Sequence, residues 1–236
     1  AIQMEKIVLQ SPQSIIAENY KTIRTVILLS EDEPVSQSIL VSSMTQATGK
    51  TVTSVNLAIT FAMSDRRVLL IDGDMRRPRI HTIFNVSNDS GLSTYLAGGE
   101  SEIRPHQPNP DLPGLYVIPS GPVPTNPSEL LSSARLRKLL TAVSETYDFI
   151  FIDSPPILNV TDANLISKAV DQTLLVIRSG VSTYDSLRRL EAMMSQINAP
   201  ILGYIVNAVD EKEQRHYYYK YYGNYYYGSD YTAEKT

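Results

Sequence analysis

The chain has 236 residues, 42% of them hydrophobic, and a formal net charge of -4 at pH 7. This size and composition suit one α/β domain with a single core, which we expect to span residues 1–209. The negative charge disfavours a nucleic acid partner, and the absence of cysteine excludes disulfides, thiolate zinc sites and cysteine nucleophiles.

The first predicted element is a helical segment at about residues 14–29. Glu18, Lys21 and Arg24 recur there at three-residue spacing, which places them on one face of a helix. A face of this kind is either a solvated charged surface or a contact surface for another subunit, and the sequence leaves both interpretations open.

Five short runs are apolar on successive residues, which is typical of strands covered on both faces in a parallel sheet. They span residues 38–43, 67–72, 148–153, 172–178 and 201–207. Segments of helical length lie at residues 51–63, 128–146, 162–169 and 184–197. This alternation predicts a doubly wound, mostly parallel sheet flanked by helices, with a proline-rich surface loop at residues 104–114.

A phosphate-binding loop is predicted between the first strand and the helix that follows it. Gly49-Lys50-Thr51 matches the end of the phosphate-loop signature, although Met44 stands where the signature begins with glycine. Backbone N–H groups at such a helix start face an anion, while Lys50 adds charge for the β- and γ-phosphates and Thr51 can bind Mg²⁺. The short signature alone is also compatible with an ordinary helix start. The predicted nucleotide-binding residues are Thr48, Gly49, Lys50, Thr51 and Val52.

Carboxylates follow two of the predicted strands. Asp72 and Asp74 end the second strand, and Asp153 ends the strand at residues 148–153. Ligands bind α/β sheets at the carboxyl ends of the strands, and carboxylate oxygens near Thr51 suit Mg²⁺. One aspartate after a strand is often only a turn residue, but the three together with a phosphate loop predict a site for ATP and Mg²⁺.

Apolar periodicity stops at residue 210, and residues 210–236 are predicted to be a mobile tail. The tail holds nine of the fifteen tyrosines. It is either an aromatic interaction segment or, because it is attached to a phosphoryl-transfer site, the substrate of autophosphorylation. The candidate acceptors are Tyr217, Tyr218, Tyr219, Tyr221, Tyr222, Tyr225, Tyr226, Tyr227 and Tyr231.

Taken together, these motifs resemble the bacterial tyrosine kinases (BY-kinases) of capsule and exopolysaccharide synthesis. The resemblance covers nearly the whole chain, through GKT at residues 49–51, LLIDGDMRRP at 69–78, FIFIDSPP at 149–156 and the terminal tyrosine cluster. It implies a P-loop NTPase fold and a protein-tyrosine kinase that uses ATP and Mg²⁺. It further implies that Asp72, Asp74 and Asp153 share Mg²⁺ binding and activation of the tyrosine hydroxyl, with Asp72 preferred as the base.

The phosphate loop departs from the family pattern. Where the family has a PGEGK segment, residues 46–50 read QATGK, so that one glycine is alanine and the acidic residue is missing. This departure is compatible with lower nucleotide affinity or with lower activity, and the sequence leaves both open. Related partition ATPases carry an additional lysine early in the loop, and its counterpart here is Thr45, which favours a kinase. Arg76 and Arg77 either neutralise phosphate or are surface charges, and we favour the first interpretation.

The resemblance also implies partners. The segment at residues 14–29 corresponds to a family element that joins subunits in a ring, although Lys21 replaces an arginine of that element. A membrane adaptor segment, fused or separate, a tyrosine phosphatase and no nucleic acid are expected. The expected location is the cytoplasmic face of the plasma membrane, and because residue 1 is alanine the chain is compatible with a piece of a longer, anchored protein.

Two rival functions remain open from the sequence. One is an ATPase switch that assembles a partner complex and uses the tail as an adhesive surface. The other is a pseudokinase scaffold, suggested by the altered phosphate loop. Phosphotyrosine formation separates the kinase from the switch, and nucleotide binding separates both from the scaffold.

Overall fold

The computed structural model describes residues 3–30 and 37–210, so the nine tail tyrosines lie outside the described residues. The first half of the described chain contains η1 (Met4–Lys6), α1 (Ile7–Gln10), α2 (Ile15–Leu29), β1 (Gln37–Ser43), α3 (Lys50–Ala62), β2 (Val68–Asp72), α4 (Ile80–Phe84) and α5 (Leu92–Leu96). The second half contains β3 (Leu115–Ile118), α6 (Pro127–Ser132), α7 (Ala134–Ser144), β4 (Phe149–Asp153), α8 (Thr161–Ser167), β5 (Gln172–Arg178), α9 (Tyr184–Gln196) and β6 (Ile201–Asn207).

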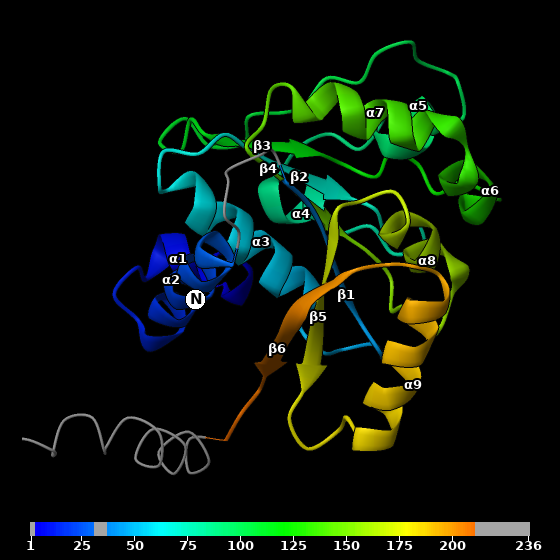
Figure 1. Ribbon diagram of the computed structural model, residues 1–236. Helices are drawn as coiled ribbons and strands as arrows, with labels where there is room; N and C mark the ends of the chain where they lie inside the picture. Colours follow the sequence, from blue (N-terminus) through cyan, green and yellow to red (C-terminus); the bar gives the residue numbers. More distant parts are fainter. Residues whose placement is uncertain (1–2, 31–36, 211–236) are drawn as a thin grey trace, which may run out of the picture.

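The six strands of the described chain form one sheet in the order β3-β2-β4-β1-β5-β6, and every neighbouring pair is parallel (Figure 1). The register pairs Asp72 at the end of β2 with Asp153 at the end of β4. Since parallel strands end at the same edge, the acidic residues and the loop after β1 meet there. The predicted parallel α/β sheet is confirmed.

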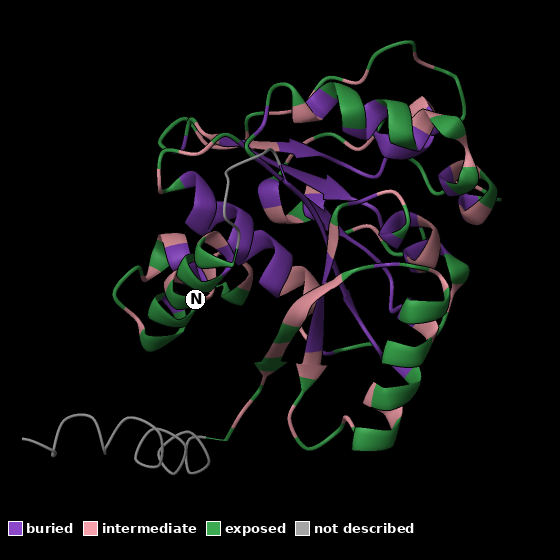
Figure 2. Cartoon of the chain, viewed as in Figure 1, coloured by how far each residue is buried: buried purple, intermediate pink, exposed green. Residues whose placement is uncertain are grey.

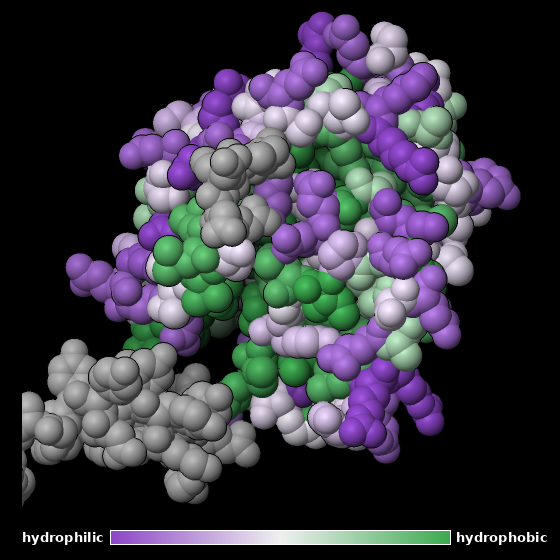
Figure 3. All heavy atoms as spheres, viewed as in Figure 1, coloured by the Kyte–Doolittle hydropathy of each residue, from purple (hydrophilic) through white to green (hydrophobic). Residues whose placement is uncertain are grey.

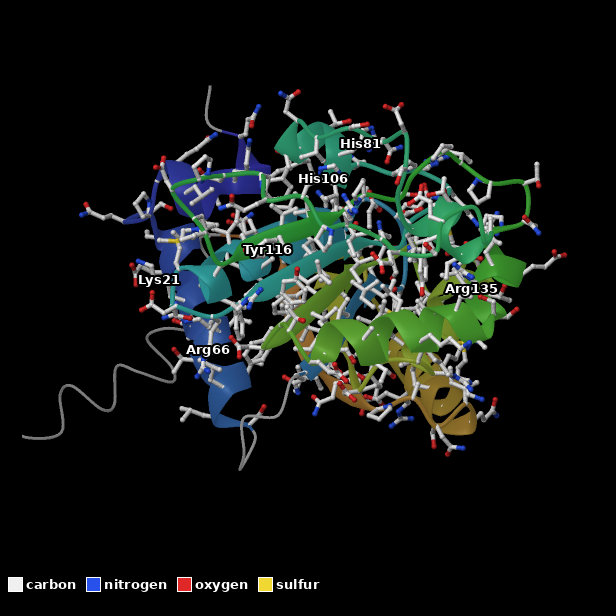
Figure 4. All side chains as sticks on the ribbon, turned by 90° about the horizontal axis from the view of Figure 1, so that it is seen from above. Lys21, Arg66, His81, His106, Tyr116 and Arg135 are labelled. Carbon is white, nitrogen blue, oxygen red and sulfur yellow. The ribbon has the colours of Figure 1, made fainter. Side chains whose placement is uncertain are left out.

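Helices cover both faces of the sheet, which makes the molecule three-layered. α1, α2 and α3 pack on one face with Val41, Leu70 and Phe151, whereas α7 packs on the other with Leu69 and Ile152. Figure 4 shows Lys21 on α2 and Arg135 on α7 at opposite sides of the molecule. The central strands and α3 are buried in Figure 2, because apolar side chains on both faces of each strand leave water together.

β6 is the edge strand next to β5 and is less covered than the central strands. Tyr204 and Val206 are exposed on it, and apolar surface is visible near β5 and β6 in Figure 3. A strand at the edge has a neighbour on one side only, so the burial pattern of β6 is mixed.

Two parts of the sequence prediction need correction. β3 was not predicted, because its four residues follow a proline-rich loop and give too short an apolar run. The single helix predicted at residues 128–146 is two helices, α6 and α7, since Ser133 between them is extended with ψ of 153°. Ser132 and Ser133 have modest helix propensity, and the break is consistent with this local sequence.

The helix predicted near the N-terminus is α2. Ser14 caps it, because its hydroxyl accepts a hydrogen bond from the backbone N–H of Ala17. Lys21 pairs with Glu18 at 2.6 Å, and Arg24 donates to the backbone oxygen of Thr60 in α3 at 2.9 Å. The three residues of the predicted subunit contact therefore all make contacts inside this chain, and their role in assembly stays a prediction.

Candidate active site

The loop between β1 and α3 is held in a strained shape by residues from two distant strands. Gly49 has a φ of 91°, and a Cβ added there would lie 2.2 Å from Nδ2 of Asn207. That Nδ2 donates to the backbone oxygen of Thr48 at 2.8 Å, while Arg178 Nη1 donates to that of Ala47 at 2.9 Å. Backbone conformation therefore favours glycine at position 49, and a larger residue would also displace the Asn207 amide from the Thr48 carbonyl.

Asn207 and Arg178 were not singled out in the sequence. They end β6 and β5 at the same edge as the loop, so the sheet order brings them to it. Their positions as the last residues of predicted strands are the signal that points to this edge.

A cavity of ≈ 500 Å³ lies against this loop. It is lined by residues 46–52, which include all five predicted nucleotide-binding residues, and by Asp74 from the loop after β2. Nζ of Lys50 lies 3.7 Å from Oδ2 of Asp74, and both side chains are largely buried. The cavity therefore presents a cation and a carboxylate side by side at the start of α3.

Asp153 is held by two hydroxyl groups from α3. Thr51 donates to its Oδ2 at 2.7 Å, and Ser54 donates to its Oδ1 at 2.9 Å. Burial raises the pKa of Asp153, against the opposing effects of the Lys50 charge and of the two hydroxyl hydrogen bonds. Ser54 was missed in the sequence, although its spacing of three residues from Thr51 places both on one face of the helix.

Asp72 is buried and bound to backbone N–H groups. Its Oδ2 accepts from the N–H of Arg79 and of Ile80 at 2.9 and 3.0 Å, and its Oδ1 accepts from that of Asp74 at 3.2 Å. Burial raises its pKa to about 7, with a further contribution from the negative charge of Asp153. Asp72 is fully buried and does not line the cavity, so Asp74 is the predicted carboxylate after β2 that faces it.

The oxygen donors near Lys50 fit Mg²⁺. Mg²⁺ usually takes one or two carboxylates and completes its shell with water and substrate phosphates. The Thr51 hydroxyl, which is bound to Asp153, and the Asp74 carboxylate, which lies near Lys50, are donors of this kind. Among residues 3–30 and 37–210, no three acidic, histidine or cysteine side chains gather as a metal site, so the predicted metal roles of Thr51, Asp72, Asp74 and Asp153 all stay predictions.

The two predicted arginines also line this cavity. Arg76 forms two hydrogen bonds with Asp162, at 2.7 and 3.1 Å. Arg77 donates to Gln46 of the phosphate loop at 3.4 Å. Both lie at the cavity wall and not on a remote surface, which supports the interpretation that they meet phosphate.

We expect Asp72 to give the ligand-free protein a measurable pH dependence. Because folding raises its pKa from 3.8 to about 7, its contribution to stability is complete below about pH 4 and is lost as the pH rises through about 7. We compare the urea unfolding midpoints of wild type and Asp72→Asn, with a chelator present so that no metal ion binds. The difference between the two midpoints should narrow as the pH rises from about 5 to about 8.

Asp111→Asn is the matched control, because Asp111 is exposed and should follow wild type across this range. A constant difference between wild type and Asp72→Asn would contradict the assignment of a raised pKa to Asp72.

No helix among the described residues is long and apolar enough to cross a membrane.

Comparisons with known proteins agree with this geometry. The family described as "AAA domain" matches residues 36–202. Tyrosine-protein kinase YwqD of Bacillus subtilis is 35% identical over 94% of this chain and 92% of its own, and the putative tyrosine-protein kinase CapB of Staphylococcus aureus is 34% identical over 93% of each. The solved kinase domain of the Escherichia coli tyrosine kinase ETK superposes with a TM-score of 0.82 at 34% identity, covering 89% of this chain and 82% of that domain. The match to the whole etk chain covers 29% of its length.

Proposed function

Since the chain belongs to the bacterial tyrosine kinase (BY-kinase) family and is an ATP-dependent protein-tyrosine kinase, we propose that it phosphorylates its own C-terminal tyrosine cluster. The observation that supports this most directly is the cavity in which Lys50 and Asp74 lie 3.7 Å apart beside the phosphate loop. One group suits the phosphates of ATP and the other suits a hydroxyl acceptor. The proposed acceptors are the nine tyrosines between residues 217 and 231, which lie outside the described residues.

The proposed reaction is in-line transfer. The tyrosine oxygen forms a bond to the γ-phosphorus as the bond from that phosphorus to the β,γ-bridging oxygen breaks, and ADP leaves with the electron pair. Backbone N–H groups of the loop and the Lys50 ammonium bind the phosphates. Thr51 and Asp74, which line the cavity, would hold Mg²⁺, and Asp153 would act on it through the Thr51 hydroxyl that it binds. When bound, Mg²⁺ would neutralise charge on the β- and γ-phosphates.

We assign contact with the acceptor hydroxyl to Asp74, because it is the carboxylate after β2 that lines the cavity. Its carboxylate orients the hydroxyl and accepts its proton as the new bond forms. The sequence-based preference for Asp72 as the base stays a prediction, and it requires that a fully buried carboxyl become accessible.

Assembly and pathway are further parts of the proposal. We propose that phosphorylation occurs in trans in a homo-oligomeric ring, with Glu18, Lys21 and Arg24 on α2 near the subunit contact. A membrane adaptor segment, fused or separate, would hold the ring at the cytoplasmic face of the membrane, where a tyrosine phosphatase would reverse the reaction. The proposed process is capsular or exopolysaccharide synthesis and export. The 29% share of the etk chain that this segment matches supports an adaptor fused in some relatives.

Intact-mass spectrometry tests the acceptor assignment. Phosphatase-treated protein incubated with ATP and Mg²⁺ should gain several phosphates, and a variant with the nine tail tyrosines changed to phenylalanine should gain none. Tyr184→Phe is the matched control, because Tyr184 is the most exposed tyrosine of the described chain and should leave the mass gain unchanged.

The same experiment decides between the proposal and its rivals. Equal phosphate gain by the tail variant would place the acceptors elsewhere. No gain by wild type, even with an adaptor segment supplied, would favour an ATPase switch if nucleotide binds and is hydrolysed. It would favour a pseudokinase scaffold if nucleotide does not bind.

A further inference from the structure

Arg76 is anchored on one side only. Its Nε donates to Oδ2 of Asp162 at 2.7 Å and its Nη2 donates to Oδ1 at 3.1 Å, so that one edge of the guanidinium meets the carboxylate in a fork. In the part of the chain that the structure describes, no hydrogen bond engages Nη1. Arg76 lines the phosphate cavity and its side chain is 43% exposed, so its other edge is open to a ligand there.

Asp162 is the buried member of this pair. Its side chain is 0% exposed and lies in the first turn of α8, two residues after Val160, which lines the cavity together with Asn159. Ser128 of α6 donates to its Oδ1 at 2.6 Å. Burial raises the pKa of Asp162, but the hydrogen bonds from Arg76 and Ser128 outweigh it and lower the pKa overall, which keeps the carboxylate charged.

An ion pair between a buried carboxylate and a half-exposed guanidinium contributes little net stability, because desolvation of the carboxylate offsets its attraction to the cation. The ion pair does, however, fix the orientation of the Arg76 guanidinium. Two parallel hydrogen bonds restrain the plane of a guanidinium, and the third, from Ser128, restrains the carboxylate in turn. Arg76 is thereby a cation set in place before a ligand arrives, which is the arrangement that stabilises charge developing in a transition state.

We propose that Asp162, steadied by Ser128, is a positioning residue that holds Arg76 against the phosphoryl group during its transfer. This inference rests on the proposed function, and it adds a second cation to Lys50. Lys50 comes from the start of α3, whereas Arg76 comes from the loop after β2, so the two cations reach the cavity from different elements.

The test compares three variants of the full chain, Asp162→Asn, Arg76→Lys and the double variant. Each is measured for its affinity for MgADP, for MgADP with aluminium fluoride as an analogue of the transferring phosphoryl group, and for its rate of tail phosphorylation. We expect Asp162→Asn and Arg76→Lys each to weaken analogue binding by about 10- to 100-fold, with a parallel fall in rate. MgADP affinity should change by less than about 3-fold, and the double variant should lose no more than either single variant, since Asp162 acts through Arg76.

Glu5→Gln is the matched control. Glu5 pairs with Arg79, another arginine at this cavity, at 3.2 Å, but that pair is more exposed. Glu5→Gln should therefore bind the analogue as tightly as wild type does. If circular dichroism shows that Asp162→Asn does not fold, Ser128→Ala takes its place. This variant removes one hydrogen bond from the Asp162 carboxylate and should weaken analogue binding by a smaller factor. Arg76→Lys still tests the role of the cation.

Three results would overturn the inference. Folded Asp162→Asn could bind the analogue as tightly as wild type, or it could lose as much affinity for MgADP as for the analogue. The third is a loss of analogue affinity in the double variant equal to the sum of the losses in the two single variants. If Asp162→Asn cannot be measured, unchanged analogue binding by both Ser128→Ala and Arg76→Lys overturns it. A wild type that binds the analogue but does not phosphorylate its tail would contradict the proposed function alone, because analogue affinities still decide the role of Asp162.

Discussion

Lys50→Met is expected to reduce the rate of tail phosphorylation by at least about 10²-fold. This is the usual effect of removing one preorganised group that stabilises charge in a transition state. Nζ of Lys50 is the cation at the start of α3, and it lies 3.7 Å from Asp74 in the cavity. Methionine keeps much of the side-chain length but removes the charge. The phosphates then lose their counter-charge, and Asp74 loses its neighbouring cation.

The measurement is the initial rate of phosphate incorporation by intact mass, at saturating ATP. Lys138→Met is the matched control, because Lys138 is exposed on α7 and should keep the wild-type rate. The thermal unfolding midpoint should show that Lys50→Met remains folded. A rate within about 3-fold of wild type in the folded variant would show that Lys50 does not stabilise the transferring phosphoryl group.

Asp74→Asn and Asp72→Asn are expected to fail in different ways. Asp74 lines the cavity, so Asp74→Asn should lower the rate by about 10²- to 10⁴-fold, the range of general acid–base catalysis, while unfolding remains close to wild type. Asp72 accepts three backbone hydrogen bonds, and an asparagine has one acceptor oxygen to offer. At about pH 5, where the raised pKa of Asp72 still contributes to stability, Asp72→Asn should therefore lower the free energy of unfolding by about 1–3 kcal/mol, the cost of an unsatisfied buried group.

Rates and urea unfolding of the two variants are measured together, with the rates taken at a temperature where both are folded. Asp89→Asn, which replaces an exposed aspartate, is the control for the amide substitution. If folded Asp72→Asn loses phosphorylation completely while Asp74→Asn keeps a rate close to wild type, the base is Asp72, and ligand binding must open the loop between β2 and α4.

The altered phosphate loop is compatible with the observed fold of the site. Ala47 stands where the family pattern has glycine, and it adopts a φ of 57°. A left-handed conformation costs alanine more than glycine. The hydrogen bond from Arg178 to the Ala47 carbonyl fastens the loop in this shape. Strain at this residue is a physical reason to expect that Ala47→Gly would stabilise the loop in this conformation.

The sequence by itself determined the parallel sheet and the edge of that sheet at which the cavity lies. Runs of successive apolar residues specify buried strands, and both Gly49-Lys50-Thr51 and the aspartates follow such runs. Because all parallel strands end at one edge, these local signals suffice to place Lys50, Asp74 and Asp153 at the same end of the sheet. The prediction of a single helix at residues 128–146 failed, because a weak break at Ser133 does not disturb the overall apolar pattern.

Only the tertiary structure decided which of these side chains face the cavity and what supports them. Asp72 and Asp74 are two residues apart, yet the first turns inward to the backbone of residues 79 and 80, and the second turns to Lys50. Arg76 reaches Asp162 across 86 positions, and Asn207 reaches Thr48 across 159. Such contacts depend on strand order and on the path of the loops. No local pattern of residues encodes them, because a hydrogen bond forms only between atoms that the fold brings within about 3 Å of each other.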